Sequence, residues 1–334
     1  ERTPGGRARK GSLAAGRPED LALAAVRATL AQVPQLDPHE LSDFYLGCAV
    51  PEGTQGSNLG RRVAVLGGMD FLPSASVNRF CASSLQATAM AAQAVKAGDG
   101  EAYLVGGVES TSHQPPNPAL PYPGSERAAA RADELFESGA TWRDPREEGE
   151  TPDVDIAMGK TAEFVAGLTG TTRAEQDEWA LKSQRAAADA VARDYFTGEI
   201  LPYTRADGAL VTADDGPRPS TTLEVLAGLP PVFRPDGTVT AGNASPLNDG
   251  ASALVVMSGR RAGELGITPL ARILGSAASA LSPEIMGLGP VEASTRLLGR
   301  LGLSIDDVDL IELNEAFAAQ VVPVVRQLGA DPER

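Results

Sequence analysis

The sequence is poor in cysteine, histidine and aromatic residues, and each shortage excludes a class of protein. Two cysteines, Cys48 and Cys81, cannot form a disulfide framework, and the absence of a CxxC pair or a Cys/His cluster leaves no zinc signature. We therefore expect a reducing compartment and a cytoplasmic protein. Eight Phe, five Tyr and two Trp among 334 residues mean that Ala, Val and Leu must build the core. This composition favours helices packed tightly on a sheet over an all-β sandwich.

Positive charge is also scarce, and long apolar runs are missing. Lys and Arg total 29 against 44 Asp and Glu, which gives a formal net charge of −15. We therefore expect no general affinity for nucleic acid or for anionic membranes, and an anionic ligand must be met by local positive groups. The longest apolar stretches, such as 251–257, are far shorter than the ~20 residues of a membrane span, so we expect no membrane insertion.

Predicted helices and strands alternate at both ends of the sequence. Hydrophobic spacing in the first hundred residues predicts helices at 18–33, 58–66 and 81–96, and strands at 44–50, 76–80 and 102–108. The alternation resumes later, with strands predicted at 251–258, 270–279 and 308–312, and helices at 290–301 and 315–328. Such an order is typical of an α/β protein whose helices cover the faces of a sheet.

The segment 114–240 between these stretches has a different composition. Prolines crowd its beginning between Pro115 and Pro123, and a strongly charged run follows at 143–150. Thr172 and Glu175 have capping-box spacing, which predicts a helix from there to about Arg193. We interpret 114–240 as a loop domain that lies over the core.

The remaining sequence is then divided into two halves of the core. We assign 1–113 with 241–258 to an N-terminal half and 259–334 to a C-terminal half that is incomplete. Residues 78–81 and 314–317 each lie where a predicted strand gives way to a helix, one in each half. This correspondence indicates a duplicated, layered α/β core with functional groups at matching corners.

Cys81 is the candidate nucleophile. It follows a predicted strand and immediately precedes a predicted helix, where unpaired backbone N–H groups of the first turn stabilise a thiolate and can also bind an oxyanion. A free cysteine is as often a small core residue, and its position alone does not decide between these two interpretations.

The residues around Cys81 add to this argument. Residues 76–87, SVNRFCASSLQA, followed by 105–110, VGGVES, resemble the nucleophile segment of the thiolase family. Further segments resemble that family in the same order along the chain: 2–4, 53–58 with Arg61, 158–163, 175–177, Arg218 with 221–224, 240–250, 286–290, and 314–317, NEAF. The likeness covers nearly the whole chain, and the ordered set is far more specific than any one segment.

The resemblance implies a fold of five α-β-α-β-α layers and a Claisen-type acyl transfer. Cys81 would attack the 3-keto carbon of a 3-ketoacyl-CoA, release acetyl-CoA and carry the acyl group until free coenzyme A removes it; synthesis is the reverse. Coenzyme A and its thioesters are the substrates, and no metal or redox cofactor is implied. A covalent thioester divides one difficult step into two easier ones. The family likeness also implies a homodimer or homotetramer.

The resemblance also implies roles for residues outside the nucleophile segment. Asn314 would hold the water that stabilises the enolate oxygen; the alternative is that it caps the helix predicted to begin at Glu315. Arg218 would lie near the nucleotide phosphates of coenzyme A, with a solvated surface arginine as the alternative. Contacts along the pantetheine are implied for Ser245 and Ala241, and apolar channel walls for Met158, Phe233 and Phe317.

The sequence departs from the family pattern in its catalytic histidine and second cysteine, which belong to Gly-His-Pro and Cys-x-Gly segments after the NEAF motif. Neither His39, His113 nor Cys48 matches those segments. We expect His39 to be solvated, His113 to be a loop residue and Cys48 to be a small core residue. The family's first strand should also precede Arg2. We expect the sequence to be part of a complete thiolase; the alternative is a short, catalytically silent acyl-CoA-binding or scaffold protein.

Overall fold

The computed structural model describes residues 1–115 and 124–333, and the chain forms two compact units. Unit 1 consists of Glu1–Pro118, Ala190–Pro217 and Pro246–Ile273; unit 2 consists of Ala119–Asp189, Arg218–Ser245 and Leu274–Arg334. The predicted insertion 114–240 is therefore shared between the two units, and the three-part domain division stays a prediction. The proline-rich stretch 116–123 lies outside the described residues.

Unit 1 is built on a five-stranded mixed sheet whose strands have the order β1-β7-β4-β2-β3. Central strand β4 pairs in parallel with β2 and antiparallel with β7. These strands are β1 (Gly6–Arg7), β2 (Asp43–Gly47), β3 (Ser74–Val77), β4 (Ala102–Ser110) and β7 (Asn248–Met257). Strands β5 (Tyr203–Thr204) and β6 (Leu210–Val211) form a separate two-stranded sheet. The parallel order β4-β2-β3 is that of an α/β protein, so the predicted class is confirmed.

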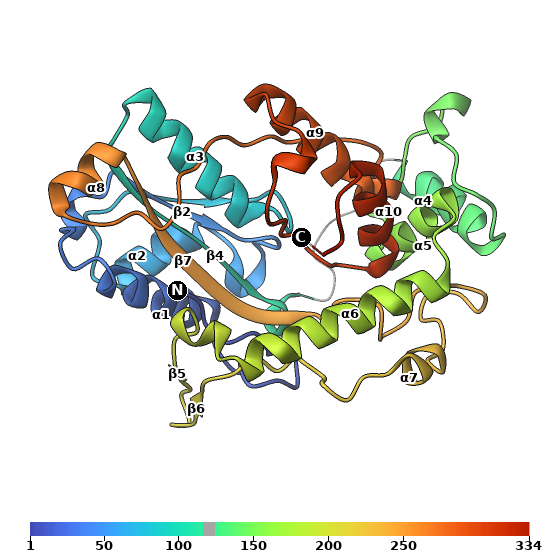
Figure 1. Cartoon of the computed structure of the whole chain (residues 1–334), viewed down its shortest axis with the longest axis horizontal. Helices are drawn as coiled ribbons and strands as arrows, with labels where there is room; N and C mark the ends of the chain where they lie inside the picture. Colours follow the sequence, from blue (N-terminus) through green and yellow to red (C-terminus); the bar gives the residue numbers. More distant parts are fainter. Residues whose placement is uncertain (116–123, 334) are drawn as a thin grey trace. The chain divides into compact units, whose positions relative to one another are not determined.

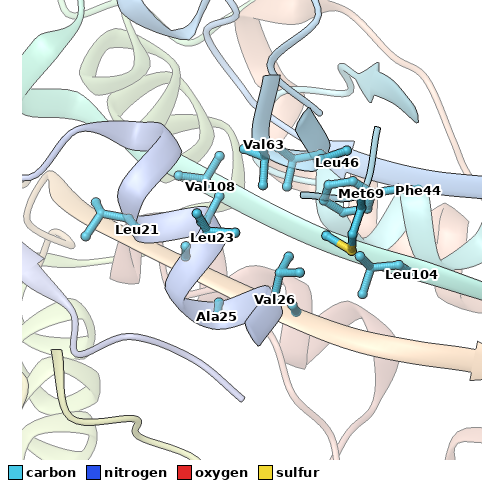
Figure 2. Packing of buried hydrophobic residues seen from close by; sticks show 14 of the residues in the cluster. Leu21, Leu23, Ala25, Val26, Phe44, Leu46, Val63, Met69, Leu104 and Val108 are labelled. Atoms are coloured by element: carbon cyan, nitrogen blue, oxygen red, sulfur yellow. The ribbon is translucent and has the colours of Figure 1, made fainter. Parts of the chain in front are cut away.

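Helices cover both faces of this sheet because its strands alternate their buried side chains. Leu104 packs on α1 (Pro18–Ala31) and α2 (Leu59–Leu66), whereas the neighbouring Tyr103 and Val105 pack on α3 (Ser83–Ala97). Figure 1 shows α3 on one face of the sheet and α1 and α2 on the other. The larger core cluster, drawn in part in Figure 2, joins Leu21 and Val26 of α1 to strand residues such as Phe44. Helix α8 (Gly259–Leu265) follows β7.

Two glycines let α3 begin very close to the sheet. Gly47 of β2 and Gly107 of β4 are register partners. A Cβ atom added to Gly47 would lie 2.4 Å from the backbone nitrogen of Ser84, and one added to Gly107 would lie 2.7 Å from the Ser84 Cβ. Because neither residue has a side chain, the first turn of α3 can pack directly against the backbone of the sheet at this pair.

Unit 2 is mostly helical within its described residues. Its α-helices are α4 (Ser125–Glu137), α5 (Met158–Thr169), α6 (Arg173–Ala192, whose last three residues belong to unit 1), α7 (Leu223–Ala227), α9 (Gly289–Leu301) and α10 (Ala318–Leu328), and the 3-10 helix η6 (Pro283–Leu288) lies beside α5. Thr172 and Glu175 exchange the backbone bonds of a capping box at the start of α6, as predicted. Helix α10 continues through Pro323.

The strands predicted at 270–279 and 308–312 are wrong for this structure. Both segments have no strand assignment. A strand requires a regular ladder of hydrogen bonds with a neighbouring strand, and neither segment is part of such a ladder in the described residues. Instead, arginines of α9 bind the first segment: Arg296 donates to the Ala278 carbonyl at 2.9 Å, and Arg300 donates to the Ser276 carbonyl. Leu310 in the second segment is exposed.

None of the helices within residues 1–115 and 124–333 combines the length and the apolar character needed to cross a membrane.

Candidate active site

Cys81 lies on the surface of unit 1, between β3 and α3. The interpretation of Cys81 as a small core residue is therefore wrong. Helix α3 begins at Ser83 and has Ala82 as its N-cap, so Cys81 lies two residues before the first helical residue and outside the helix predicted at 81–96. The backbone before it turns sharply, because Phe80 has a left-handed φ of 46° and its side chain is 71% exposed.

Two side chains hold this turn in its strained form. The Asn78 Oδ1 atom accepts from the Phe80 backbone N–H at 2.7 Å. The buried Ser83 hydroxyl accepts from the Arg79 N–H at 2.9 Å and donates to the Phe80 carbonyl at 2.5 Å. A non-glycine residue with left-handed φ costs about 1–2 kcal/mol, so it persists only where neighbours fix it. Asn78 before Cys81 and Ser83 after it thus fix the turn that leaves the thiol exposed.

The second thiol, Cys48, is buried at the end of β2, as predicted. Burial, with the nearby Glu109 carboxylate, raises the pKa of Cys48 to about 12. Glu109 also accepts from the Ala49 N–H at 2.7 Å and from the amides of Gln55 and Gln114, both at 2.8 Å. A thiol held protonated in this way is a packing residue and not a nucleophile.

Neither histidine stands out as a catalytic base. His39 is exposed, as predicted; it pairs with Asp37 at 3.0 Å and stacks on Phe71. His113 forms part of the short 3-10 helix after β4, where its Nδ1 lies 2.8 Å from the Ser110 hydroxyl.

Asn314 lies in unit 2, in an exposed position before α10. Helix α10 begins at Ala318 and has Phe317 as its N-cap, so the interpretation of Asn314 as a helix cap is wrong. The NEAF segment runs beside 243–245: the Ser245 N–H donates to the Ala316 carbonyl and the Ala318 N–H to the Asn243 carbonyl, both at 2.9 Å. These two bonds hold the end of the NEAF segment against the loop that carries Ser245.

The predicted apolar wall residues come together in unit 2. The Phe233 and Phe317 rings meet edge to face with centroids 6.4 Å apart. Phe233 also lies against Gly159, the neighbour of Met158 at the start of α5. Met158 is 47% and Phe233 38% exposed, as expected for side chains that a ligand could cover.

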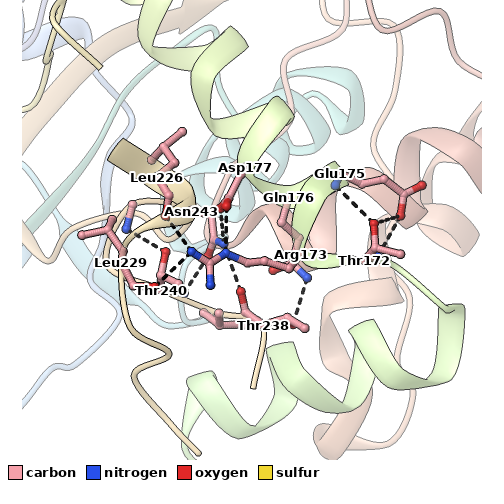
Figure 3. Close-up of polar contacts among 12 residues, drawn as sticks. Thr172, Arg173, Glu175, Gln176, Asp177, Leu226, Leu229, Thr238, Thr240 and Asn243 are labelled. Atoms are coloured by element: carbon pink, nitrogen blue, oxygen red, sulfur yellow. Dashed lines mark hydrogen bonds and ion pairs between the residues drawn. The ribbon is translucent and has the colours of Figure 1, made fainter. Parts of the chain in front are cut away.

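A buried polar network supports the loop that contains Ala241 and Ser245, both of which are exposed. Asn243 is 3% exposed; its amide donates to Asp177 at 2.9 Å and to the Thr238 carbonyl at 3.1 Å, and its oxygen accepts from the Thr240 N–H at 2.8 Å. Figure 3 shows that Asp177 in turn meets Arg173 on the same helix, α6. Both Asp177 and Asn243 lie in motif segments of the sequence, but only the fold brings them together.

Arg218 also lies in unit 2 and is exposed, which is compatible with both interpretations made from the sequence. Its backbone N–H donates to the Gln184 side chain of α6 at 2.7 Å, and its carbonyl accepts from the Thr221 hydroxyl at 2.8 Å. Among the described residues, no acceptor binds its guanidinium group. The backbone is thus fixed while the cation is available to an anionic ligand.

The fold resembles that of a solved structure along almost the full length of this chain. A crystal structure of the Bacillus anthracis acetyl-CoA acetyltransferase superposes with a TM-score of 0.84 and 36% identity, covering 99% of this chain and 82% of the other. The layered α/β fold predicted from the sequence is confirmed by this likeness.

Two sequence families match in succession: "Thiolase, N-terminal domain" over residues 1–260 and "Thiolase, C-terminal domain" over 267–334. A 3-ketoacyl-CoA thiolase of Vibrio vulnificus is 43% identical, covering 98% of this chain and 81% of its own. The 3-ketoacyl-CoA thiolase of Bacillus subtilis is 38% identical (100% and 83%), and a beta-ketoadipyl-CoA thiolase of Pseudomonas knackmussii is 42% identical (98% and 82%). This chain belongs to the thiolase family.

Proposed function

We propose that this chain is an acyl-CoA C-acyltransferase that cleaves 3-ketoacyl-CoA with coenzyme A, or condenses acyl-CoAs in the reverse direction, through an acyl-enzyme on Cys81. The observation that carries the proposal is the agreement of two independent facts. The two thiolase family matches leave only residues 261–266 uncovered, and the one exposed cysteine lies in the segment that resembles the family's nucleophile.

In the degradative direction, the Cys81 sulfur forms a bond to C3 of the substrate and the C2–C3 bond breaks. The electron pair passes to the departing acetyl-CoA as an enolate, whose oxygen is stabilised by a water on Asn314. The proton that the Cys81 thiol loses on attack balances the one added at C2, which completes acetyl-CoA. Free coenzyme A then attacks the thioester, and its thiol proton ends on Cys81. Stabilising the charge that develops on oxygen is the largest contribution such a site makes.

Coenzyme A is proposed to bind along unit 2. Arg218 meets the nucleotide phosphates, Ser245 and Ala241 flank the pantetheine, and Met158, Phe233 and Phe317 form the apolar wall. The support for this assignment is that the wall side chains lie together and that the Arg218 guanidinium is exposed.

We also propose a cytoplasmic homodimer or homotetramer that needs no metal or redox cofactor and acts in fatty-acid β-oxidation. Both thiols are free, which suits a reducing compartment. Strand β3 is the sheet's edge, and Phe80 and Leu85 beside it are 71% and 70% exposed. Open strand edges and exposed apolar side chains favour association. Light scattering coupled to size exclusion measures the mass in solution.

The test is incubation of the native full-length protein with labelled acyl-CoA, followed by intact mass and peptide mapping. The wild type should gain one acyl group on Cys81, and Cys81→Ala should gain none while keeping its circular dichroism spectrum. Cys48→Ala is the matched control and should still be acylated. Turnover near the wild-type rate in Cys81→Ala would refute the mechanism. Absence of any acylation in the wild type would favour a silent acyl-CoA-binding protein.

A further inference from the structure

Glu315 is the second residue of the NEAF motif, and among the described residues its side chain makes the only hydrogen bonds that hold the first half of that motif. Within residues 1–115 and 124–333, Asn314 forms no hydrogen bond and Glu315 forms none through its backbone. The segment before them, 308–313, has no regular structure, and Leu310 in it is 68% exposed. The position of Asn314 therefore depends on the neighbouring carboxylate.

The Glu315 carboxylate is bound at both oxygens by one face of α6. Oε1 accepts from the Trp179 indole N–H at 2.8 Å, and Oε2 accepts from the Ser183 hydroxyl at 2.5 Å. The donors are four residues apart, so they lie on the same side of the helix one turn apart. The Lys182 ammonium lies over the Trp179 ring, 5.6 Å from its centroid. A carboxylate held at two points has a fixed orientation, and so does the backbone that carries it.

We infer that Glu315 is a positioning residue: through Trp179 and Ser183 it fixes the Asn314 amide in the orientation needed to hold the enolate-stabilising water. This inference rests on the proposed function of Asn314. It assigns no proton transfer to Glu315, because both carboxylate oxygens are already occupied by donors from α6.

The chemistry of the two donors gives a conservative variant. A tryptophan N–H can only donate, whereas a serine hydroxyl can donate or accept. In Glu315→Gln the amide oxygen can accept from Trp179 and the amide N–H₂ can donate to Ser183, so both links survive without the charge. Glu315→Ala loses both links. A positioning role predicts that Gln restores activity, whereas an acid or base role predicts that it does not.

The experiment measures steady-state thiolysis by the full-length protein. Because a small displacement of a catalytic group can cost about 100-fold, Glu315→Ala should lower kcat about 10- to 100-fold with KM for the acyl-CoA nearly unchanged. The rate at which iodoacetamide modifies Cys81 should not change, since that step does not use Asn314. Glu315→Gln should keep kcat within about twofold of wild type, with the same pH profile.

Partial variants and a control complete the series. Trp179→Phe and Ser183→Ala each remove one donor and should each lower kcat by an intermediate factor; they also decide the question if Glu315→Ala does not fold. Arg326→Ala breaks a different link between α10 and α6, the exposed ion pair of Arg326 with Glu175, and should leave kcat unchanged.

Three outcomes would overturn the inference: wild-type kcat in Glu315→Ala, wild-type kcat in both partial variants, or a Glu315→Gln enzyme as slow as Glu315→Ala. The variant Asn314→Ala distinguishes failure of this inference from failure of the proposed role of Asn314. If kcat falls in Asn314→Ala but stays at the wild-type value in Glu315→Ala, only the positioning role is overturned. If kcat stays at the wild-type value in Asn314→Ala, the proposed role of Asn314 itself is overturned.

Discussion

The ring of Phe233 lies directly against the α-carbon of Gly159 at the start of α5. A Cβ atom built on Gly159 would lie 2.1 Å from two ring carbons, far inside van der Waals contact. The same ring meets Phe317 edge to face. Gly159 therefore decides where one proposed wall of the coenzyme A channel can lie.

Gly159→Ala should move Phe233 and weaken substrate binding. Alanine favours a helix over glycine by up to about 1 kcal/mol, but overpacking costs about 1–3 kcal/mol. We expect a net loss of about 1 kcal/mol in the free energy of unfolding and a raised KM for acyl-CoA. In a Phe233→Ala background the obstruction is absent, so the same change should stabilise the protein. Urea denaturation of the wild type, the two single variants and the double variant measures the change in the free energy of unfolding in each background. An equal change in the two backgrounds would contradict the contact.

Phe80→Gly should stabilise the turn before Cys81. Glycine adopts a left-handed φ without the ~1 kcal/mol cost that Phe80 bears, and little packing is lost because Phe80 is 71% exposed. Ser83→Ala removes one of the two side chains that hold the same turn and should destabilise the protein by about 1 kcal/mol. Thermal and urea unfolding measure both changes. A Phe80→Gly protein less stable than wild type would show that the exposed ring has another role.

The Cys48 thiol should make stability fall in alkaline solution. Its pKa is raised to about 12 in the folded protein, against the ~8.5 of a free cysteine. Below pH ~8.5 both states hold the proton; above it the unfolded chain releases its proton first, so the free energy of unfolding decreases until about pH 12. Other groups titrate in this range, so the comparison is between wild type and Cys48→Ala in urea at pH 8 and 10. The wild type should lose more stability than the variant over that interval; equal losses would contradict burial of this thiol.

Metal removal should leave the reaction unchanged. The proposed steps use the Cys81 thiol, the water on Asn314, coenzyme A with its thioesters, and proton transfer, and none of them involves a metal. Exhaustive dialysis against EDTA, with a re-addition series of Mg²⁺, Mn²⁺ and Zn²⁺ as the control, should alter kcat by less than about twofold. A loss that a single divalent ion restores would require a different mechanism.

The sequence predicted the helices and strands of unit 1 well where the hydrophobic signal is strong. The apolar run at 102–108 predicts a buried strand and the helical spacing of 18–33 predicts an amphipathic helix, and these form as β4 (Ala102–Ser110) and α1 (Pro18–Ala31). The segments 270–279 and 308–312 are apolar too but have no strand assignment, because a strand also requires a regular hydrogen-bond ladder with another strand. Pairing is a property of the whole fold and not of the segment.

The sequence proposes the candidate site residues but not the contacts that support them. Cys81 and Asn314 are assigned from motifs, yet the choice between an exposed and a buried Cys81 needed the structure. The contact of Glu315 with Trp179 joins residues 136 positions apart, and that of Asn243 with Asp177 joins residues 66 apart. No local pattern records such contacts, because they arise only when α6 packs beside the two loops.

The paired glycines Gly47 and Gly107 have a consequence for redesign. A side chain at either position would push the beginning of α3 outward, and the sulfur of Cys81 would travel with it. Bulk added there would displace the reacting sulfur without changing the residues of the proposed coenzyme A wall. Attempts to alter coenzyme A binding should therefore vary the proposed walls in unit 2 and keep glycine at both strand positions.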